Sequence, residues 1–337
     1  NQLTGMASWY NYSADKEWEE RSLPIGNGSF GGNILGSIAA ERITLNEKSL
    51  WRGGPNTAKG AAYYWNVNKE SAHLLPEIRQ AFAEGNEAKA QKLTEENFNG
   101  WAQYEAENES PFRFGSYTTM GEIYIETGLS EIGMSDYKRV LSLDSALAVV
   151  SFRKDGVLYE RTSFASFPDS VMVLKFSADK PGMQNLTFSY AGNPEAEGKI
   201  APHGDKGILY TGKLKNNQME FALCIHAQHK GGTLQATPDG KLIARNADEV
   251  IFLLTADTDY KINFDPDFND PKTYVGVQPV QSVLAMMESA EMHDYHALKK
   301  RHQADYLQLF NRVKLHLNPN APMTLESIDF PDPVIGI

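Results

Sequence analysis

The stretch from Gly121 to about Tyr260 consists of one strand-like run after another, and helical periodicity is nearly absent from it. The runs are separated by turn signals such as Asp155-Gly156. A parallel sheet would need a helix between successive strands, whereas strands at this spacing are typical of an antiparallel sandwich. We therefore predict a mainly β fold with a large antiparallel core. The clearest predicted strands are 157–167, 171–176, 186–190, 221–227 and 250–256.

The first hundred residues mix strand and helix signals. Residues 34–45 alternate around Ala40-Glu41, which predicts two strands with a tight turn at that pair. From 72 to 84 the apolar residues instead repeat at three and four positions, which predicts a helix that ends at Gly85. A second helix is predicted from a cap at Asn86 to about Gly100.

Two more helices are predicted near the end of the chain, at 280–291 and 294–311, followed by a strand at 313–317. Four prolines mark the last residues as a tail. The resulting domain plan is a β super-sandwich over 1–270 with a small helical insertion at about 68–100. A C-terminal helical linker over 271–318 and a tail over 319–337 complete it.

Composition excludes several classes of protein. Asp and Glu exceed Lys and Arg by 43 to 32, giving a net charge of −11, and the basic residues are scattered, so nucleic acid is not an expected partner. No apolar run is long enough to cross a bilayer. The single cysteine, Cys224, cannot form an intramolecular disulfide or a multi-thiolate metal site. Because the first residue is Asn1, we expect a processed or trimmed product.

Two motifs suggest a dinucleotide site and a metal site, but the elements predicted around them argue against both. Residues 26–31 match the dinucleotide fingerprint G-x-G-x-x-G, yet a β pattern follows where a helix should begin, so we interpret them as a glycine-rich turn. Cys224 and His226 would share one face of a strand while His229 would point to the other. Two ligands are too few for zinc, so no metal site is predicted.

One segment, 45–55, has the composition of a sugar-contacting surface. It places amide, carboxylate, indole and guanidinium groups at the end of a predicted strand, and sugars offer both apolar CH faces and hydroxyl groups to such side chains. The alternative is that its tryptophan packs in the core or between domains. The candidate sugar-side or interdomain residues are Asn46, Glu47, Trp51, Arg52, Trp65 and Trp101.

A series of short motifs, ordered over about residues 8–318, resembles the N-terminal part of glycoside hydrolase family 95, the inverting α-L-fucosidases and their relatives. They are Trp18 with Leu23–Gly28; Leu45-Asn46-Glu47 with Leu50-Trp51 and Gly53; Leu75-Pro76 with Ile78-Arg79; Gly121–Tyr124; Tyr137–Arg139 to Leu143-Asp144; Tyr159–Arg161 with Phe164–Ser166; Thr255–Thr258; and Leu298, His302, Asp305-Tyr306 and Arg312-Val313.

The resemblance implies an N-terminal β super-sandwich joined by helices to a catalytic (α/α)6 barrel, its intramolecular partner. Only 19 residues follow Asn318, too few for twelve helices, so we expect no catalytic residue in this chain. The expected role is structural support with loop residues at the pocket rim, a fucosylated glycan being the substrate of the parent enzyme. No cofactor is expected, and the resemblance implies a periplasmic or secreted location.

Two other functions remain open at this stage. One is a free-standing carbohydrate-binding module in which an exposed tryptophan forms the platform for a sugar ring. The other is a structural or oligomerisation piece without a ligand. Exposure of the tryptophans separates the first of these from a domain in which they only pack.

Overall fold

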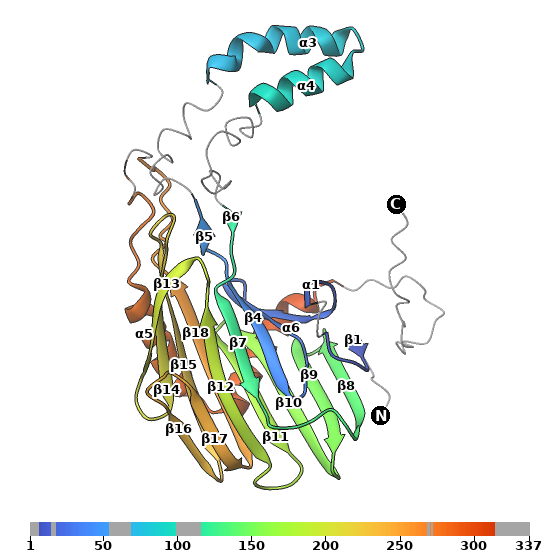
Figure 1. Ribbon diagram of the computed structural model, residues 1–337, viewed down its shortest axis with the longest axis vertical. Helices are drawn as coiled ribbons and strands as arrows, with labels where there is room; N and C mark the ends of the chain where they lie inside the picture. Colours follow the sequence, from blue (N-terminus) through green and yellow to red (C-terminus); the bar gives the residue numbers. More distant parts are fainter. Residues whose placement is uncertain are drawn as a thin grey trace, which may run out of the picture.

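The computed structural model describes residues 7–14, 18–53, 69–98, 116–267, 270 and 272–313. Two antiparallel sheets lie face to face in it (Figure 1). The nine-stranded sheet runs β1 (Ala7–Tyr10), β8 (Met134–Ser142), β9 (Leu147–Lys154), β10 (Val157–Ser166), β11 (Val171–Ala178), β18 (Glu249–Thr258), β15 (Glu220–Lys230), β14 (Gly207–Leu214), β13 (Ala196–Pro202). The seven-stranded sheet runs β16 (Thr233–Ala236), β17 (Leu242–Ala247), β12 (Gln184–Gly192), β7 (Gly121–Glu126), β4 (Ala40–Glu47), β3 (Phe30–Ile34), β2 (Leu23–Gly26).

The short strands β5 (Trp51–Arg52) and β6 (Ser116–Tyr117) form a separate antiparallel pair. The helices are α1 (Trp18–Arg21), η1 (Lys69–Leu74), α3 (Leu75–Ala83), α4 (Glu87–Phe98), α5 (Pro279–Glu291) and α6 (Tyr295–Phe310), η1 being a 3₁₀ helix. In the described part of the chain, none of these helices has the length and apolar character of a membrane span. The prediction of a mainly β sandwich with small helical parts is confirmed.

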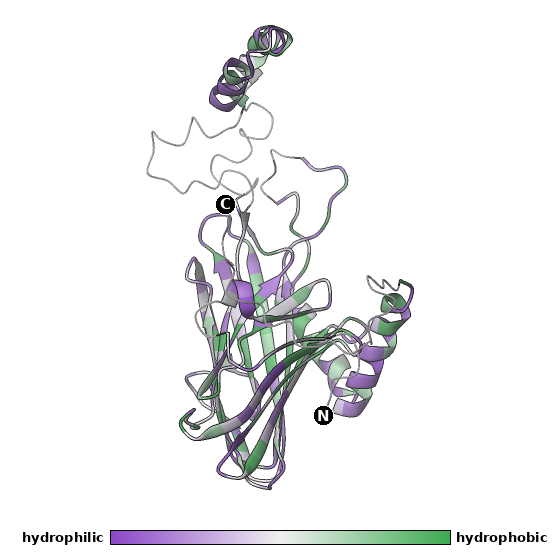
Figure 2. Cartoon of the chain, turned by 90° about the vertical axis from the view of Figure 1, so that its right-hand side faces the viewer, coloured by the Kyte–Doolittle hydropathy of each residue, from purple (hydrophilic) through white to green (hydrophobic). Residues whose placement is uncertain are grey.

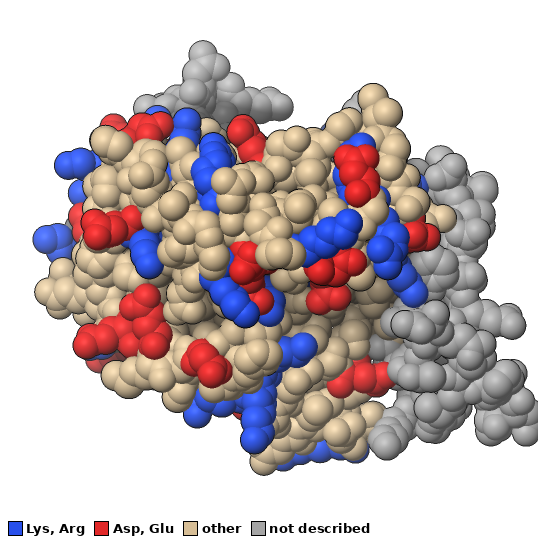
Figure 3. Space-filling view, turned by 90° about the horizontal axis from the view of Figure 1, so that it is seen from below, with Lys and Arg blue, Asp and Glu red and all other residues tan. Residues whose placement is uncertain are grey.

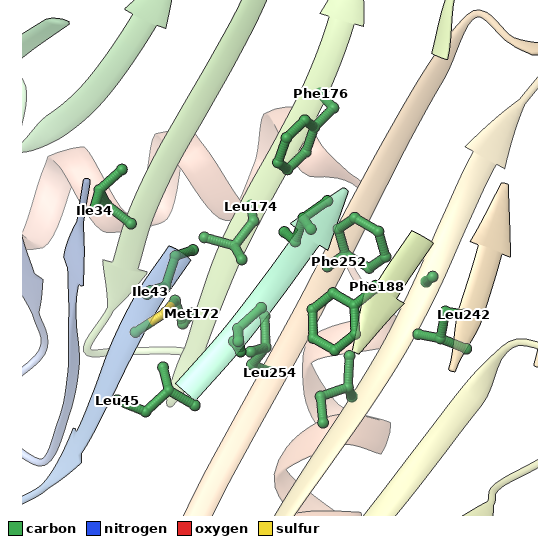
Figure 4. Packing of buried hydrophobic residues seen from close by; sticks show 14 of the residues in the cluster. Ile34, Ile43, Leu45, Met172, Leu174, Phe176, Phe188, Leu242, Phe252 and Leu254 are labelled. Atoms are coloured by element: carbon green, nitrogen blue, oxygen red, sulfur yellow. The ribbon is translucent and has the colours of Figure 1, made fainter. Parts of the chain in front are cut away.

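The core lies between the two sheets and is built from the inward-facing side chains of both (Figure 4). Ile43 on β4 and Phe188 on β12 face Met172 on β11 and Phe252 on β18, and all four are fully or almost fully buried. The rings of Phe188 and Phe252 lie 4.8 Å apart. Burying each such side chain stabilises the fold by about 1.5–3 kcal/mol, so the alternation along the strands determines which face is inside.

The helices α5 and α6 pack on the outer face of the nine-stranded sheet, and Figure 2 shows them along one side of the sandwich. Val283 and Met287 of α5 cover Cys224 of β15, while Leu298 of α6 joins the same cluster next to Phe164 of β10. Asp294 caps α6 by accepting a hydrogen bond from the Ala297 amide. The outer face of the larger sheet is therefore a second core, which the segment predicted as a linker covers.

The helical insertion forms a hairpin with its own small apolar cluster. Pro76 stands in the first turn of α3, Gly85 follows with a φ of +73°, and Asn86 caps α4 by accepting from the Lys89 amide. These features agree with the predicted boundaries. The last residues of the predicted strand 313–317, from 314 on, and the tail 319–337 lie outside the described residues.

The predicted turn at Ala40-Glu41 is wrong, because both residues belong to β4 and the connection lies at 35–39. Glu41 points inward and forms an ion pair with Arg161, with 2.8 Å between Nη1 and Oε2. Gly36, with a φ of +82°, makes the turn instead, and a Cβ there would lie 2.5 Å from atoms of Arg139 and Tyr137. One member of this buried ion pair, Glu41, was predicted to lie in a turn, whereas the other, Arg161, lies in a predicted strand.

His302 makes the attachment of α6 sensitive to pH. Its Nε2 lies 2.8 Å from the Ala146 carbonyl oxygen, and its ring stacks on Phe164. Burial lowers the pKa of His302, although the Ala146 and Ala165 carbonyls and the carboxylates of Asp305 and Asp169 oppose this. The unfolded chain therefore binds more protons between the lowered pKa and about 6.5.

We expect the free energy of unfolding to fall as the pH drops below about 6.5, by up to about 1.4 kcal/mol per pH unit from this group. The loss should level off below the folded-state pKa of His302. Urea unfolding at a series of pH values measures the slope, with His302→Gln as the reference without an imidazole. Equal slopes in both proteins would contradict the assignment.

Candidate functional site

Three of the six candidate residues, Glu47, Trp51 and Arg52, lie at the upper end of the sandwich in Figure 1, where β4 and β18 end and β5 begins. We use the name β5–β6 cluster for Glu47, Trp51, Arg52, Tyr117, Glu195 and Asn217. Trp51 and Tyr117 meet edge to face with ring centroids 6.1 Å apart, and they are 43% and 45% exposed. Arg52 forms an ion pair with Glu195. The short strand β5 thus contributes Trp51 to an exposed aromatic pair and Arg52 to an ion pair.

Trp51 is oriented by its own turn. Its Nε1 donates to the Lys48 carbonyl oxygen at 2.8 Å, and the Leu50 amide donates to the Glu47 carbonyl oxygen at 3.1 Å. Leu50 is completely buried beside them. The indole therefore has one face and edge fixed by the protein while part of its surface stays open to solvent.

Glu47 joins the two sheets and is not an exposed acid. Its Oε2 accepts from the Ser49 amide at 2.8 Å and from the Ser49 hydroxyl at 2.6 Å, and that hydroxyl lies 2.6 Å from Oγ1 of Thr258 on β18. The side chain is almost fully buried. Burial raises the pKa of Glu47, the Ser49 hydrogen bonds oppose the rise, and the Asp257 carboxylate adds to it. Glu47 therefore stabilises the turn that connects β4 to β5.

Two buried asparagines hold the cluster, and the sequence analysis missed both. Asn217, 2% exposed, donates from Nδ2 to the Trp51 carbonyl oxygen at 2.6 Å and to that of Gly53 at 3.0 Å. Asn193 donates to Thr118 Oγ1 at 2.8 Å and accepts from the Glu195 amide at 2.7 Å. From the sequence alone, both look like ordinary turn residues, because their hydrogen-bond partners are far away along the chain.

The six candidates are not all brought together. Glu47, Trp51 and Arg52 lie in or beside the cluster. Asn46 is half-buried on the opposite face of β4 from Glu47, opposite Gly31 of β3. Trp65 and Trp101 lie outside the described residues.

The structure places the residues of both rejected motifs in the two sheets. Residues 26–31 close the β2–β3 hairpin, where the Asn27 amide donates to the Phe30 carbonyl oxygen at 3.1 Å. Cys224 and His226 share the outer face of β15, and His226 lies 2.8 Å from Glu291 of α5. Burial raises the pKa of Cys224 to about 12, so its thiol stays protonated. Within the described ranges, no three His, Cys, Asp or Glu residues group as metal ligands.

Comparison with known proteins gives a family match over most of the chain. The family described as "Glycosyl hydrolase family 65, N-terminal domain" matches residues 9–263. The chain belongs to this family. The predicted relationship to the N-terminal domains of fucosidase-like glycoside hydrolases is confirmed.

Two curated proteins resemble this N-terminal domain along nearly its whole length. Alpha-L-fucosidase 2 of Arabidopsis thaliana is 28% identical over 327 residues, which cover 90% of this chain and 36% of the plant protein. Probable alpha-fucosidase A of Aspergillus niger is 29% identical over 319 residues, covering 89% and 36%. The chain thus spans about a third of the length of these relatives. A solved structure, a putative kojibiose phosphorylase from human microbiome, aligns with a TM-score of 0.49 at 11% identity over 89% of this chain and 37% of that one.

The hydrogen bonds of Asn217 lead to a testable prediction about the β5–β6 cluster. Asn217→Ala removes the donor to two carbonyl oxygens, so we expect a loss of about 1–3 kcal/mol in the free energy of unfolding and a changed environment of Trp51. Urea unfolding and tryptophan fluorescence measure the two effects. The matched control is Asn216→Ala, because Asn216 is exposed. Equal stability of the two variants would contradict the anchoring role.

Proposed function

We propose that this chain is the N-terminal sandwich domain of an enzyme that hydrolyses α-L-fucosides or related sugars. In this proposal it supports a catalytic (α/α)6 barrel and contributes Trp51 and Arg52 to the rim of the catalytic pocket. The two relatives named as fucosidases support the substrate class. The observation that carries the rim role is the half-exposed Trp51–Tyr117 pair beside the Arg52–Glu195 ion pair.

These groups match the chemistry of a sugar. The indole offers an apolar face to the CH groups of a pyranose, while the guanidinium and carboxylate can bond to its hydroxyls. Asn217 and Asn193 hold the backbones of both strands, so little entropy is lost when a ligand binds. A preorganised aromatic and charged surface at one end of the sandwich supports the proposed role at the pocket rim.

The same end carries an apolar surface that fits the proposed barrel contact. Along α6, Tyr295, Leu298 and His302 are buried against the sheet, whereas the last turn exposes Leu309. Arg301 ties the helix to Asp169 of the β10–β11 turn at 2.7 Å. The exposed end of a fixed helix supports the proposal that the following domain packs there.

The isolated chain and the longer barrel-carrying polypeptide test the proposal together. We expect no hydrolysis of 4-nitrophenyl α-L-fucopyranoside by the isolated chain and hydrolysis by the longer one. In the longer polypeptide, Trp51→Ala should raise KM about tenfold with a smaller change in kcat, because the indole touches the substrate away from the reacting bond. Ile132→Ala is the control, since Ile132 is an exposed apolar residue far from the site. Hydrolysis by the isolated chain would overturn the proposal.

A free-standing carbohydrate-binding module is the second candidate, and the exposure of Trp51 favours it. A free-standing module should bind a glycan as the isolated chain, whereas the support domain of a hydrolase need not. A fluorescence response to a fucosylated oligosaccharide that disappears in Trp51→Phe would support the module. If the isolated chain gives no response while the barrel-carrying polypeptide is active, the module interpretation fails.

A further inference from the structure

A small pocket lies on the outer face of the seven-stranded sheet, at the lower end of the sandwich. It is formed by the connection from β3 to β4, the first residues of β4, and Tyr124 of β7, with a volume of about 300 Å³. Five residues of β4 separate Arg42 from Glu47, which corresponds to about 17 Å along an extended strand. The pocket is therefore distinct from the β5–β6 cluster. Its lining residues are Leu35, Ser37, Ala39, Ala40, Arg42, Tyr124 and Glu131.

Arg42 and Glu122 form an ion pair beside the pocket, and Glu131 adds an exposed carboxylate to its lining. The Nε of Arg42 donates to Oε2 of Glu122 at 3.0 Å, and a second guanidinium nitrogen reaches the other carboxylate oxygen. The Tyr124 hydroxyl also donates to this carboxylate. These bonds lower the pKa of Glu122 against the effect of burial, so the carboxylate is ionised and neutralises Arg42. An anionic ligand would have to compete with Glu122 for the guanidinium.

The arrangement is rigid and half-open. Arg42 and Tyr124 are direct partners in the β4–β7 ladder, and the side chains of Arg42 and Glu122 are 33% and 24% exposed. The neighbouring Thr44, on the same face of β4, has a buried hydroxyl for which the described residues provide no hydrogen-bond partner. The guanidinium has more N–H donors, and the carboxylate more acceptor sites, than the ion pair uses. Both groups can therefore still form hydrogen bonds toward solvent.

We propose that this pocket binds a neutral pyranose unit of a glycan. The ring of Tyr124 and the apolar surface of Ala39 and Ala40 would take the CH face of the sugar. Ser37 and the Arg42–Glu122 pair would bond to its hydroxyls. A volume of about 300 Å³ is at the small end of ligand pockets, which fits one sugar ring better than an extended chain.

Figure 3, which views the sandwich from below, shows acidic and basic side chains interspersed at the lower end of the molecule, with no broad region of one sign. The inference does not depend on the proposed function, since a sugar held here would lie away from the upper end.

NMR titration of the isolated chain tests the proposal. The probes are methyl α-L-fucopyranoside, methyl β-D-galactopyranoside and methyl β-D-xylopyranoside. We expect at least one of them to shift the amide signals of Ser37, Ala39 and Ala40 with a dissociation constant of about 1 mM. Tyr124→Ala should weaken this binding about tenfold, whereas Tyr124→Phe, which keeps the ring, should change it by less than about threefold.

Phe264→Ala is the control, because Phe264 is an exposed aromatic residue that belongs neither to the pocket lining nor to the β5–β6 cluster. It should leave the shifts at Ser37, Ala39 and Ala40 unchanged, and thermal unfolding checks that each variant is folded. The proposal is overturned if no probe shifts these amides, if Tyr124→Ala binds as well as the parent chain, or if sodium sulfate displaces the sugar. Shifts confined to Trp51 and its neighbours would overturn it while supporting the upper-end site.

Discussion

Arg161→Met is expected to lower the free energy of unfolding by about 3–5 kcal/mol, because it leaves a buried carboxylate without its countercharge. Arg161 and Glu41 have side chains only 5% and 2% exposed. Nη1 of Arg161 donates to Glu41 at 2.8 Å, and Nη2 donates to the Ile38 carbonyl oxygen at 2.9 Å. The pair therefore fixes the 35–39 connection onto β10.

Glu41 would respond to the loss by taking up a proton. Burial already raises the pKa of this carboxyl, and the charge of Arg161 is the largest influence that lowers it. Without Arg161 the pKa should rise further, so the variant should lose less stability at acidic pH than at neutral pH. Urea unfolding at both pH values measures the difference.

Two controls isolate the buried pair. Arg42→Met breaks the half-exposed Arg42–Glu122 pair on the outer face, and we expect it to cost about 1 kcal/mol or less. The double variant Glu41→Gln with Arg161→Met should recover part of the stability lost in Arg161→Met, because no charge is left buried. A double variant no more stable than Arg161→Met would show that lost packing, and not the charge, causes the effect.

The strands could be predicted because a strand that is buried on one face alternates apolar and polar residues along a short stretch of sequence. Strands β10 and β15 differ from their predicted bounds by a few residues at most. The interior ion pair was not predictable, because Arg161 and Glu41 are 120 positions apart and each looks like a surface residue in its own segment. Local polarity placed a turn at Glu41, where the structure continues the strand.

In the candidate site too, local sequence signals were readable, whereas contacts between distant segments were not. Trp51 could be named as a candidate from its neighbours in sequence, since aromatic and polar groups at a strand end form a local signal, whereas its 43% exposure is known only from the structure. Asn217 was missed because its partners, the carbonyls of Trp51 and Gly53, come from a different region of the chain. A turn-forming Asn and an anchoring Asn look alike until the fold brings the second segment beside it.

Leu298→Asp should destabilise the isolated chain strongly and Leu309→Asp hardly at all, although they make the same change on the same helix. Leu298 is 1% exposed and packs in the cluster between α6 and the nine-stranded sheet, so a charged aspartate there should cost about 3–5 kcal/mol. Leu309 is 59% exposed, and in the isolated chain its replacement should stay within about 0.5 kcal/mol. Urea unfolding of both variants makes the comparison.

The second variant also reports on the proposed barrel. If a following domain packs on the last turn of α6, Leu309→Asp puts a charge into that contact, and the barrel-carrying polypeptide should lose stability that the isolated chain keeps. Val313, 79% exposed just beyond the helix, provides an independent position for the same substitution. Unchanged stability of the longer polypeptide with either aspartate would mean that the domain contact lies elsewhere, because no buried interface tolerates both charges.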